Sequence, residues 1–521
     1  MGKRMPAGGG ASYTHAGRGY FAKRGLTRQA GAVALWGLGV AAVMSGVFSG
    51  WNFGIADAGW GGMLIATIVI GAMYTLMILS ISEMTAAMPH TGGAYSFARS
   101  AFGPWGGFVT GFAETIEYVI TTAVVGTFAG LYADAIIEDL FAISWPLWIW
   151  IIIFYAVFVT LNAAGSAASF TFAFIITIIS LVVLAIFVIA ALVSGQFATA
   201  NLFDIPAQIG ESTFLPYGVE GILLAMPFAI WFFLGIEELP LAAEETRDPA
   251  TDLPRGSIAG MLTLLLSAFL VLVLNPGVLG AQAVSTSGEP ILDGFRAIFP
   301  SGNIAALLSL MALTALIASF QSIMFAAGRN VYSLSRAGYY PKFLSLTGRR
   351  KTPWLALLGS AIVGITLVLG LGIITYGDEE APFIDAANAL LLMAVFGAVI
   401  AYVARMAAFL TLRRRFPHVN RPYRSPTGRW GAATAGGIAL VTLILMPFHE
   451  AFRSAILWVA AVYAVGLALF ALVGRRRLTL APEEEYAVTR GVHGHPEVEG
   501  YDVTEQLEES GQEEYFPDGG D

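Results

Sequence analysis

Two glutamates, Glu114 and Glu117, lie well inside a long apolar stretch of the chain, where an ionisable side chain is expensive and usually functional. Because they are three residues apart, they share roughly one face of a helix. A carboxylate in such a place can bind a cation, pair with a basic side chain or carry a proton. The alternatives are a structural polar pair and the lining of a water-filled vestibule.

Two other segments place small residues where a membrane helix should be most regular: MSGVFSGWNFG, from Met44 to Gly54, and WFFLGIEE, from Trp231 to Glu238. Backbone that gives up helical hydrogen bonds inside a bilayer is tolerated where it lines a protein-walled cavity. We therefore predict two broken helices. The first break is assigned to Ser45, Gly46, Val47 and Phe48, and the second to Phe232, Phe233, Leu234 and Gly235. For Gly46 and Gly235 the alternative is close helix packing, for which small residues are common in membranes.

The breaks indicate what kind of ligand could bind between them. Carbonyls freed from the helical ladder suit an ammonium or metal cation, and the N-terminus of a half-helix suits a carboxylate or hydroxyl. Trp231, Phe232 and Phe233 could cover a small ammonium by cation–π contact, although an aromatic content of 12% makes chance placement a competitor. Thr121 and Thr122 could hold a hydroxyl, or bond their own helix.

The elements that must position these residues are membrane spans. Of the 521 residues, 56% are hydrophobic and only 12% are charged, about half the charged share of a soluble domain. Apolar runs of about 20 residues, enough to cross a ~30 Å hydrocarbon core, recur along the chain. They predict an all-α integral membrane protein with twelve transmembrane helices, near 31–50, 60–86, 105–131, 145–162, 169–193, 219–237, 257–276, 304–328, 354–375, 385–411, 430–447 and 453–473.

Basic residues alternate between the connecting segments. All of the 28 Lys and Arg residues except Arg296 and Arg453 fall in one alternating set, to which we also assigned Arg405. The positive-inside rule then places both termini in the cytoplasm, and we expect the plasma (inner cell) membrane. No nucleic-acid partner is expected, and the oligomeric state is left open.

We divide the chain into a flexible basic segment (1–27), a transporter-type transmembrane domain (28–476) and an acidic tail (477–521). The tail has few apolar residues and no usable period, so we predict that it is disordered. Within the domain, helices 1–5 and 6–10 form two halves, each starting with a broken helix. Because five is odd, the second half is inverted relative to the first. Helices 11 and 12 lie outside this repeat.

Several motifs resemble the amino acid–polyamine–organocation (APC) superfamily of carriers. They are SGVF in helix 1, Glu83 followed by P..GG.Y.F, the GxE that ends helix 6 with E..RDP....PRG after it, and R..Y.LSR.G..P with TP after helix 8. Together they cover roughly 450 residues in the expected order. SGWNFG, GGMLIAT and GFAETIEY are similar to the ethanolamine permease group.

The resemblance implies twelve helices, a five-plus-five core and uptake of a small amine solute. It places Glu117 in the substrate site, Glu114 one turn toward the cytoplasm, and Glu237 as a group that couples occupancy to gating. The alternative for Glu237 is a solvated interfacial glutamate. Glu83 is either a proton-sensitive group or a partner of basic loop residues.

The substrate class follows from charge. An amino alcohol brings only a cation and needs a buried anion, which Glu117 would supply, so ethanolamine is preferred. Neutral or cationic amino acids are the alternative. Helix 5 lacks the lysine of many proton-coupled relatives and has Thr177 near its place. The coupling ion, H⁺ or Na⁺, therefore stays open, as do exchange and facilitated uptake. No metal site or other cofactor is expected.

Two other classes of protein are disfavoured. A membrane-embedded enzyme needs grouped nucleophiles, metal ligands or acid–base pairs. The six histidines lie in loops, near helix ends or in the tail, and no HExxH, GxSxG or phosphate loop occurs. A channel or receptor would show charged rings or a large soluble sensor domain, and neither is visible.

Overall fold

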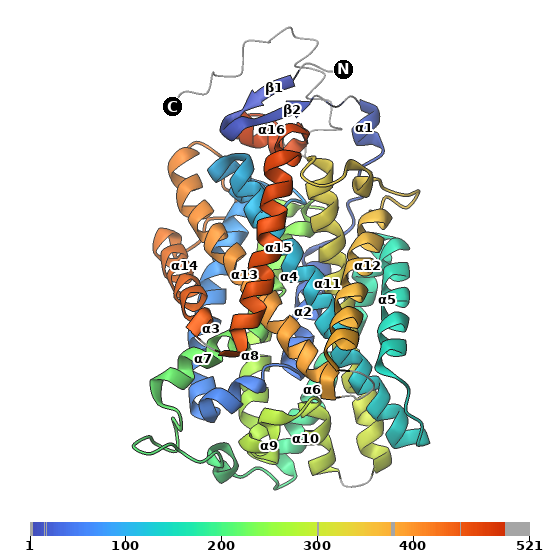
Figure 1. Ribbon diagram of the computed structural model, residues 1–521, viewed down its shortest axis with the longest axis vertical. Coiled ribbons are helices and arrows are strands. Elements are labelled where there is room, and N and C mark those ends of the chain that lie inside the picture. The colour runs from blue at the N-terminus through green and yellow to red at the C-terminus, as the bar shows by residue number, and fades with distance from the viewer. Residues whose placement is uncertain are drawn as a thin grey trace.

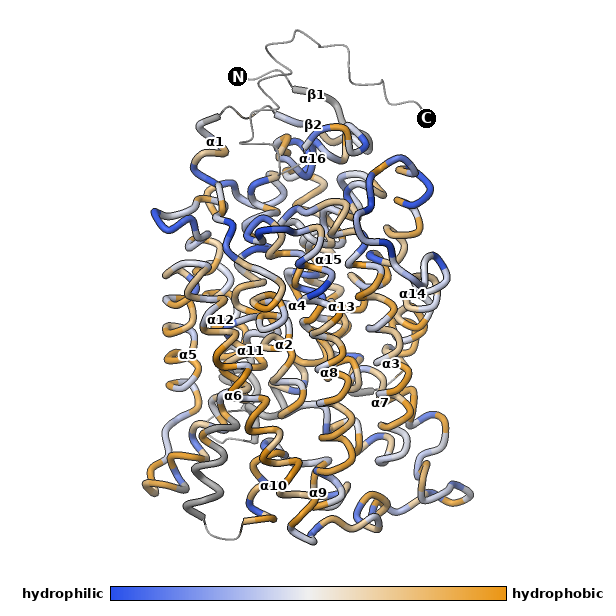
Figure 2. The backbone as a smooth tube through the Cα atoms, turned by 180° about the vertical axis from the view of Figure 1, so that it is seen from behind, coloured by the Kyte–Doolittle hydropathy of each residue, from blue (hydrophilic) through white to orange (hydrophobic). Residues whose placement is uncertain are grey.

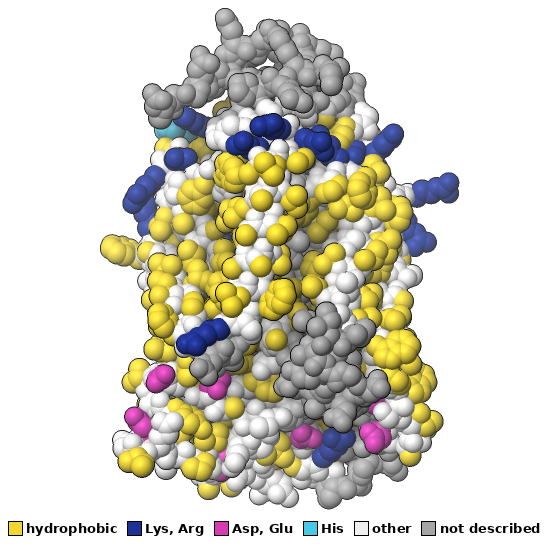
Figure 3. All heavy atoms as spheres, viewed as in Figure 1, with side chains coloured by type: hydrophobic (Ala, Val, Ile, Leu, Met, Phe, Trp, Pro, Cys, Tyr) yellow, Lys and Arg dark blue, Asp and Glu magenta, His cyan; other side chains and the backbone are white. Residues whose placement is uncertain are grey.

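The computed structural model describes residues 4–14, 16, 18–299, 302–376, 381–448 and 450–494. Long helices lie side by side, and most run along the long axis of the molecule (Figure 1). We call the end formed by β1, β2, α1 and α16 the basic end, because Lys and Arg side chains gather in a band there (Figure 3). Hydrophobic side chains cover the middle of the same face, and the α9–α10 end is the opposite end.

Each predicted apolar run corresponds to a long helix or to a broken one. Their bounds are α2 (Ala32–Phe48), α3 (Phe53–Ala87), α4 (Ala94–Phe141), α5 (Leu147–Ala163), α6 (Ser166–Val193), α7 (Gly218–Trp231), α8 (Pro249–Leu279), α11 (Gly302–Arg336), α12 (Trp354–Tyr376), α13 (Ala381–Arg415), α14 (Gly428–Leu445) and α15 (Glu450–Leu472). Within the described residues, eight spans are long and apolar enough to cross a membrane, and three shorter apolar helices join them. The apolar belt in mid-molecule is visible in Figure 2.

Shorter elements lie at the two ends and within the breaks. They are β1 (Arg4–Ala7), η1 (Gly8–Gly10), β2 (Ala11–Thr14), α1 (Arg18–Ala22), η2 (Thr199–Phe203), η3 (Ile236–Glu245), α9 (Ala281–Thr286), α10 (Pro290–Ile298), η4 (Lys342–Ser345), η5 (Met446–Phe448), η6 (Gly474–Arg476), β3 (Leu478–Thr479) and α16 (Pro482–Val488).

Helix packing follows the predicted five-plus-five repeat. In that numbering α2 to α6 are helices 1–5, and α7 with η3, α8, α11, α12 and α13 are helices 6–10. The contacts occur in pairs that a two-fold axis would exchange: α2 packs on α8 as α3 packs on α7, and α4 packs on α13 as α11 packs on α6. Helices α4 and α11 occupy equivalent positions in the two halves, so the two-fold axis would map the contact between them onto itself. This pairing fits two inverted halves related by a pseudo-two-fold axis.

Two glycines divide helices that otherwise run on continuously. Gly59 has φ +69°, which interrupts α3, so residues 53–58 belong to the first span and the second span begins after Gly59. A Cβ at Gly59 would lie 2.3 Å from the ring of Pro216. Gly103 (φ +81°) separates residues 94–102 from the rest of α4, and Pro104 follows it. Proline suits the first turn of a helix because its missing N–H would be unpaired there.

Both terminal predictions need correction within the described residues. The segment predicted as flexible (1–27) contains β1, β2 and α1, and the tail predicted as disordered contains β3 and α16. In the three-stranded sheet, β2 pairs antiparallel with β1 and parallel with β3, with Tyr13 opposite Leu478. Glu483, Glu484 and Glu485 of α16 are buried. Composition predicts that acidic side chains are solvated, whereas Glu483 pairs with the buried Arg336 and Glu484 with the buried Arg99. Residues 495–521 lie outside the described residues.

Candidate functional site

The first break lies one turn later than predicted. Residues 45–48 form the last turn of α2, where Ser49 N–H still donates to Ser45 O at 2.8 Å. The chain leaves the helix at Ser49, and Gly50 has φ +90°, a left-handed conformation that favours glycine. The assignment of Ser45, Gly46, Val47 and Phe48 to the break itself is therefore wrong, although they border it.

The side chain of Asn52 stabilises this break, and the sequence analysis did not identify Asn52 as a site residue. Its Oδ1 accepts the Gly50 N–H at 3.1 Å, and its Nδ2 donates to Val284 O at 2.7 Å and Ser287 O at 2.8 Å. One buried amide thus pairs with one N–H of the break and with two carbonyls at the end of α9, and so joins the two segments. The available signal was an asparagine two residues after a glycine, a pattern typical of turns.

The second break lies where it was predicted. Helix α7 ends at Trp231, residues 232–234 form a turn, and η3 begins at Ile236 after Gly235, which has φ +115°. A Cβ at Gly235 would lie 3.0 Å from Ile323 Cδ1 and 3.2 Å from Ala42 Cβ. Gly235 is therefore needed both for the backbone conformation and for the close packing of α2 and α11.

The two breaks are in direct contact. A Cβ at Gly46 would lie 2.0 Å from the carbonyl oxygen of Trp231, so only glycine allows this approach. The Trp231 indole N–H donates to Ser49 O at 3.0 Å. Phe48 O accepts a hydrogen bond from the Tyr132 hydroxyl at 3.1 Å. The ends of α2 and α7 therefore meet inside the bundle, as the predicted site requires.

Aromatic rings surround this contact. Phe232 stacks on Trp51, with ring centroids 5.0 Å apart and planes 22° apart, and Phe233 packs against Tyr74 at 5.4 Å. Trp51 and Trp231 are also buried. The structure brings the three predicted aromatic residues to the break and adds Trp51, from the first break, to the same cluster.

Glu117 is fully buried in α4, and neither of its carboxylate oxygens has a hydrogen-bond partner among the described residues. The charged group that acts on it most strongly is the carboxylate of Glu237, which has the same sign. Leaving a buried ionised acid without donors costs its full desolvation penalty. Glu117 is thus placed to receive a cation or a proton.

Glu237 belongs to a hydrogen-bonded chain that starts at the second break. It accepts the Gly235 N–H at 3.0 Å and a hydrogen bond from the Tyr402 hydroxyl of α13. The Tyr402 and Tyr74 hydroxyls lie 2.7 Å apart, which extends the chain to α3. Glu237 is only 2% exposed, so the alternative of a solvated interfacial glutamate is wrong.

Glu114 is paired, in contrast to Glu117. Its carboxylate forms a buried ion pair with Arg405 of α13, and Asn330 Nδ2 lies 3.4 Å from its other oxygen. Arg405 is 1% exposed within the helix, so its assignment to a connecting segment is wrong. The ion pair joins helices 3 and 10 and gives Glu114 the character of a structural polar pair.

Glu83 lies among basic groups near the end of α3. It pairs with Arg413, with Nε 2.9 Å from Oε1, and with Arg421 at 3.2 Å, and it accepts the Ser425 N–H at 2.9 Å. Of the two interpretations of Glu83, these contacts are those of a partner of basic residues. The prediction that it gates or couples transport stays untested.

Hydroxyl groups on α4 and α6 mostly bond the helix backbone. Thr121 Oγ1 donates to Glu117 O at 2.6 Å and Thr122 Oγ1 to Val119 O at 2.8 Å, which is the local bonding of packed hydroxyls. Thr177 Oγ1, in the helix 5 position discussed above, donates to Gly37 O of α2 at 3.0 Å. Thr122 Oγ1 also lies 3.0 Å from the Tyr155 hydroxyl of α5, and the Thr177 bond joins α6 to α2. That Thr121 or Thr122 holds a substrate hydroxyl stays a prediction.

Comparison with known proteins assigns the family. Residues 32–475 match the Amino acid permease family, so the chain belongs to it. The protein is a multi-pass membrane protein and a secondary transporter of that family, within the APC superfamily, and not an enzyme.

Individual relatives agree with this assignment. An uncharacterized transporter of Rhizobium meliloti (strain 1021) is 31% identical over 351 residues, which cover 67% of this chain and 73% of that protein. The aromatic amino acid transport protein AroP of Escherichia coli (strain K12) is 25% identical over 82% of this chain and 90% of its own length. Among solved structures, the nucleobase–cation symporter Mhp1 in a closed conformation with bromovinylhydantoin bound has a TM-score of 0.46 and 16% identity, covering 84% of this chain and 96% of Mhp1.

Proposed function

We propose that this permease takes up a small amine, with ethanolamine preferred, by alternating access to a site between the two breaks. The observation that carries the proposal is Glu117, a buried carboxylate that receives no donor from the described residues. A substrate ammonium would supply the missing donors. Charge-assisted hydrogen bonds of this kind are the strong ones in proteins.

The charge balance around Glu117 supports a substrate with net positive charge. Three buried carboxylates, those of Glu114, Glu117 and Glu237, act together with one guanidinium, that of Arg405. Arg405 is paired with Glu114 and also acts on Glu117 and Glu237, so one guanidinium offsets three carboxylates and the cluster keeps an excess of negative charge. An ammonium group, or a coupled proton, would relieve it.

The aromatic rings at the break support the same class of ligand. Phe232 and Phe233 belong to the helix 6 turn, with ring centroids 6.2 Å apart, and Trp51 stacks on Phe232. Ring faces attract an ammonium by about 2 kcal/mol when the contact is desolvated. A small amine could be held by such ring faces together with one carboxylate.

Amino acid transport is the second candidate, favoured by the similarity to AroP, an aromatic amino acid transport protein. A zwitterion brings its own carboxylate, for which the unpaired N–H groups at the start of a half-helix are suited. Its ammonium would still meet Glu117, so charge balance alone favours the amine.

Uptake of labelled ethanolamine into proteoliposomes tests the proposal. Glu117→Gln keeps the shape of the side chain and removes its charge, so we expect uptake to fall roughly 10- to 100-fold. Glu220→Gln, an exposed acid on α7, is the matched control and should transport normally. Near-normal ethanolamine uptake by Glu117→Gln would exclude this role. Uptake of labelled phenylalanine or arginine that unlabelled ethanolamine does not inhibit would favour the second candidate.

We also propose that the basic end faces the cytoplasm of the cell, with the protein in the inner membrane. The support is the concentration of Lys and Arg at that end. The chain has no cysteine, so single cysteines report topology cleanly. In intact cells a membrane-impermeant maleimide should label Glu211→Cys and leave Arg424→Cys unlabelled; the reverse pattern would invert the orientation.

A further inference from the structure

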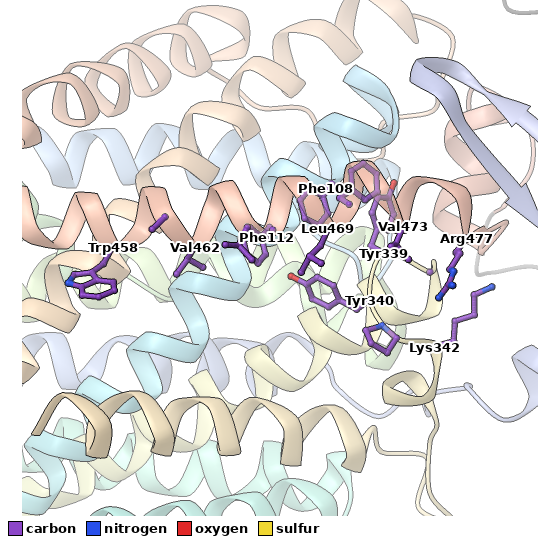
Figure 4. Close-up of a pocket in the computed structure, with 17 residues that line it drawn as sticks. Phe108, Phe112, Tyr339, Tyr340, Lys342, Trp458, Val462, Leu469, Val473 and Arg477 are labelled. Carbon is purple, nitrogen blue, oxygen red and sulfur yellow. The ribbon is translucent and has the colours of Figure 1, made fainter. Parts of the chain in front are cut away.

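An apolar groove runs along α15. It is a cavity of about 740 Å³, with one wall formed by α15 and the other by α4 and the segment after α11 (Figure 4). Along α15 and the residue that follows it, the wall is a stripe of side chains that are each at least 42% exposed: Trp458, Val462, Val465, Leu469 and Val473. Phe108, Phe112 and Tyr340 lie opposite.

The dimensions of the groove suit a lipid chain. Trp458 and Val473 are 15 positions apart, which corresponds to about 22 Å at ~1.5 Å per residue. One leaflet contributes about 15 Å of hydrocarbon thickness to the bilayer. An acyl chain that entered along α15 would therefore be covered over its whole length.

The groove carries positive charge at one end only. Lys342 and Arg477 lie at the basic end, and Trp458 lies at the other extreme (Figure 4). Among the described residues no carboxylate forms an ion pair with either cation. Partial burial lowers the pKa of Lys342, and the positive charges of Arg24 and Arg477 lower it further. A bound anion would offset this mutual repulsion.

We propose that the groove binds an anionic phospholipid from the leaflet at the basic end. One acyl chain lies against the α15 stripe, and the phosphate lies between Lys342 and Arg477. Basic pockets between membrane helices are suited to such headgroups. A zwitterionic lipid would bring its own cation close to a cluster that is already positive, so it binds less tightly. The proposal does not depend on the identity of the transported substrate.

Native mass spectrometry of the detergent-purified protein with phosphatidylglycerol or phosphatidylcholine tests this site. The wild type should bind phosphatidylglycerol preferentially. Lys342→Ala/Arg477→Ala removes two cations and should weaken that binding roughly 30-fold. Val465→Trp fills the groove without changing charge and should also abolish it. Arg414→Ala/Arg429→Ala, two exposed arginines elsewhere at the basic end, is the matched control and should bind like the wild type.

Four results would overturn the proposal. The first is equal binding of the two lipids by the wild type, and the second is retained preference in Lys342→Ala/Arg477→Ala. The third is a lipid-independent dimer that Val465→Trp converts to monomer, which would mean that a second copy covers the groove. Competition by soluble glycerol phosphate at equal concentration would likewise assign the cations to a free anion. A melting temperature in phosphatidylcholine equal to that of the wild type verifies that each variant is folded.

Discussion

The indole nitrogen of Trp231 lies 3.0 Å from the carbonyl oxygen of Ser49 and donates a hydrogen bond to it. The acceptor belongs to the first break and the donor to the last residue of α7 before the second. Both groups are buried, so the bond is made where water cannot replace it. The two half-helices are thereby fixed relative to each other at the point where a substrate would pass between them.

Trp231→Phe should therefore reduce transport more than it reduces folding. The substitution keeps an aromatic ring but leaves the Ser49 carbonyl unsatisfied, at a cost of about 1–3 kcal/mol. We expect a lower maximal uptake rate and a melting temperature a few degrees lower. Trp430→Phe, an exposed indole on α14, is the control. Unchanged uptake would show that the bond is dispensable for transport.

Gly46→Ala should abolish transport. The added methyl would lie 2.0 Å from the Trp231 carbonyl oxygen, so α2 and α7 must separate. Overpacking of this kind costs about 1–3 kcal/mol. Gly437→Ala on α14 is the matched control, because nothing lies within 4 Å of the added methyl. Thermal unfolding and uptake measured on both variants decide the point; wild-type behaviour of Gly46→Ala would show that the breaks do not need this contact.

Arg405→Met should be strongly destabilising, by about 3–5 kcal/mol, because it leaves the buried Glu114 carboxylate without its ion pair. The double variant Glu114→Gln/Arg405→Met removes both charges and should recover much of the loss. Denaturation of Arg405→Met, Glu114→Gln and the double variant in detergent completes the cycle. Additive effects of the two substitutions would indicate that the ion pair contributes nothing to stability.

Docking of α16 should weaken as pH rises. Burial raises the pKa of Glu483 to about 7; the positive charge of Arg336 lowers this pKa, and the negative charge of Glu244 raises it. Burial alone raises the pKa of Glu485 to about 7. Because both values lie above 4.5, the folded state holds protons that the released segment gives up. The stabilisation is complete below pH 4.5 and is lost as pH rises to about 7.

Hydrogen exchange of residues 482–488, corrected for intrinsic rates, measures this change. Protection should fall between pH 5 and pH 8 in the wild type, and Glu483→Gln/Glu485→Gln should flatten the profile. A rise in protection with pH would contradict the assignment.

Much of the fold could be predicted from the sequence because apolar length and glycine placement are local signals. The run around Phe232–Gly235 contains its own turn residue, so the second break was located correctly. The first break was predicted one turn too early because Gly46 was interpreted as part of the turn. Its role is close approach to Trp231, whereas the turn is fixed by Gly50 and Asn52.

Partners distant in sequence could not be predicted in the same way. Glu114 and Arg405 are 291 positions apart in the sequence, and one sequence gives no sign that α4 and α13 are neighbours. The tail was misjudged for the same reason. Glu484 pairs with Arg99 and accepts hydrogen bonds from the Tyr95 and Tyr339 hydroxyls at 2.9 Å, contacts that composition cannot show.

The docking of α16 also determines where this permease can be modified. A purification tag or fluorescent reporter fused directly after residue 477 would delete Glu484 and leave the buried guanidinium of Arg99 without its carboxylate. Fusions should instead begin beyond residue 494, so that the described ion pairs of α16 with Arg99 and Arg336 are retained.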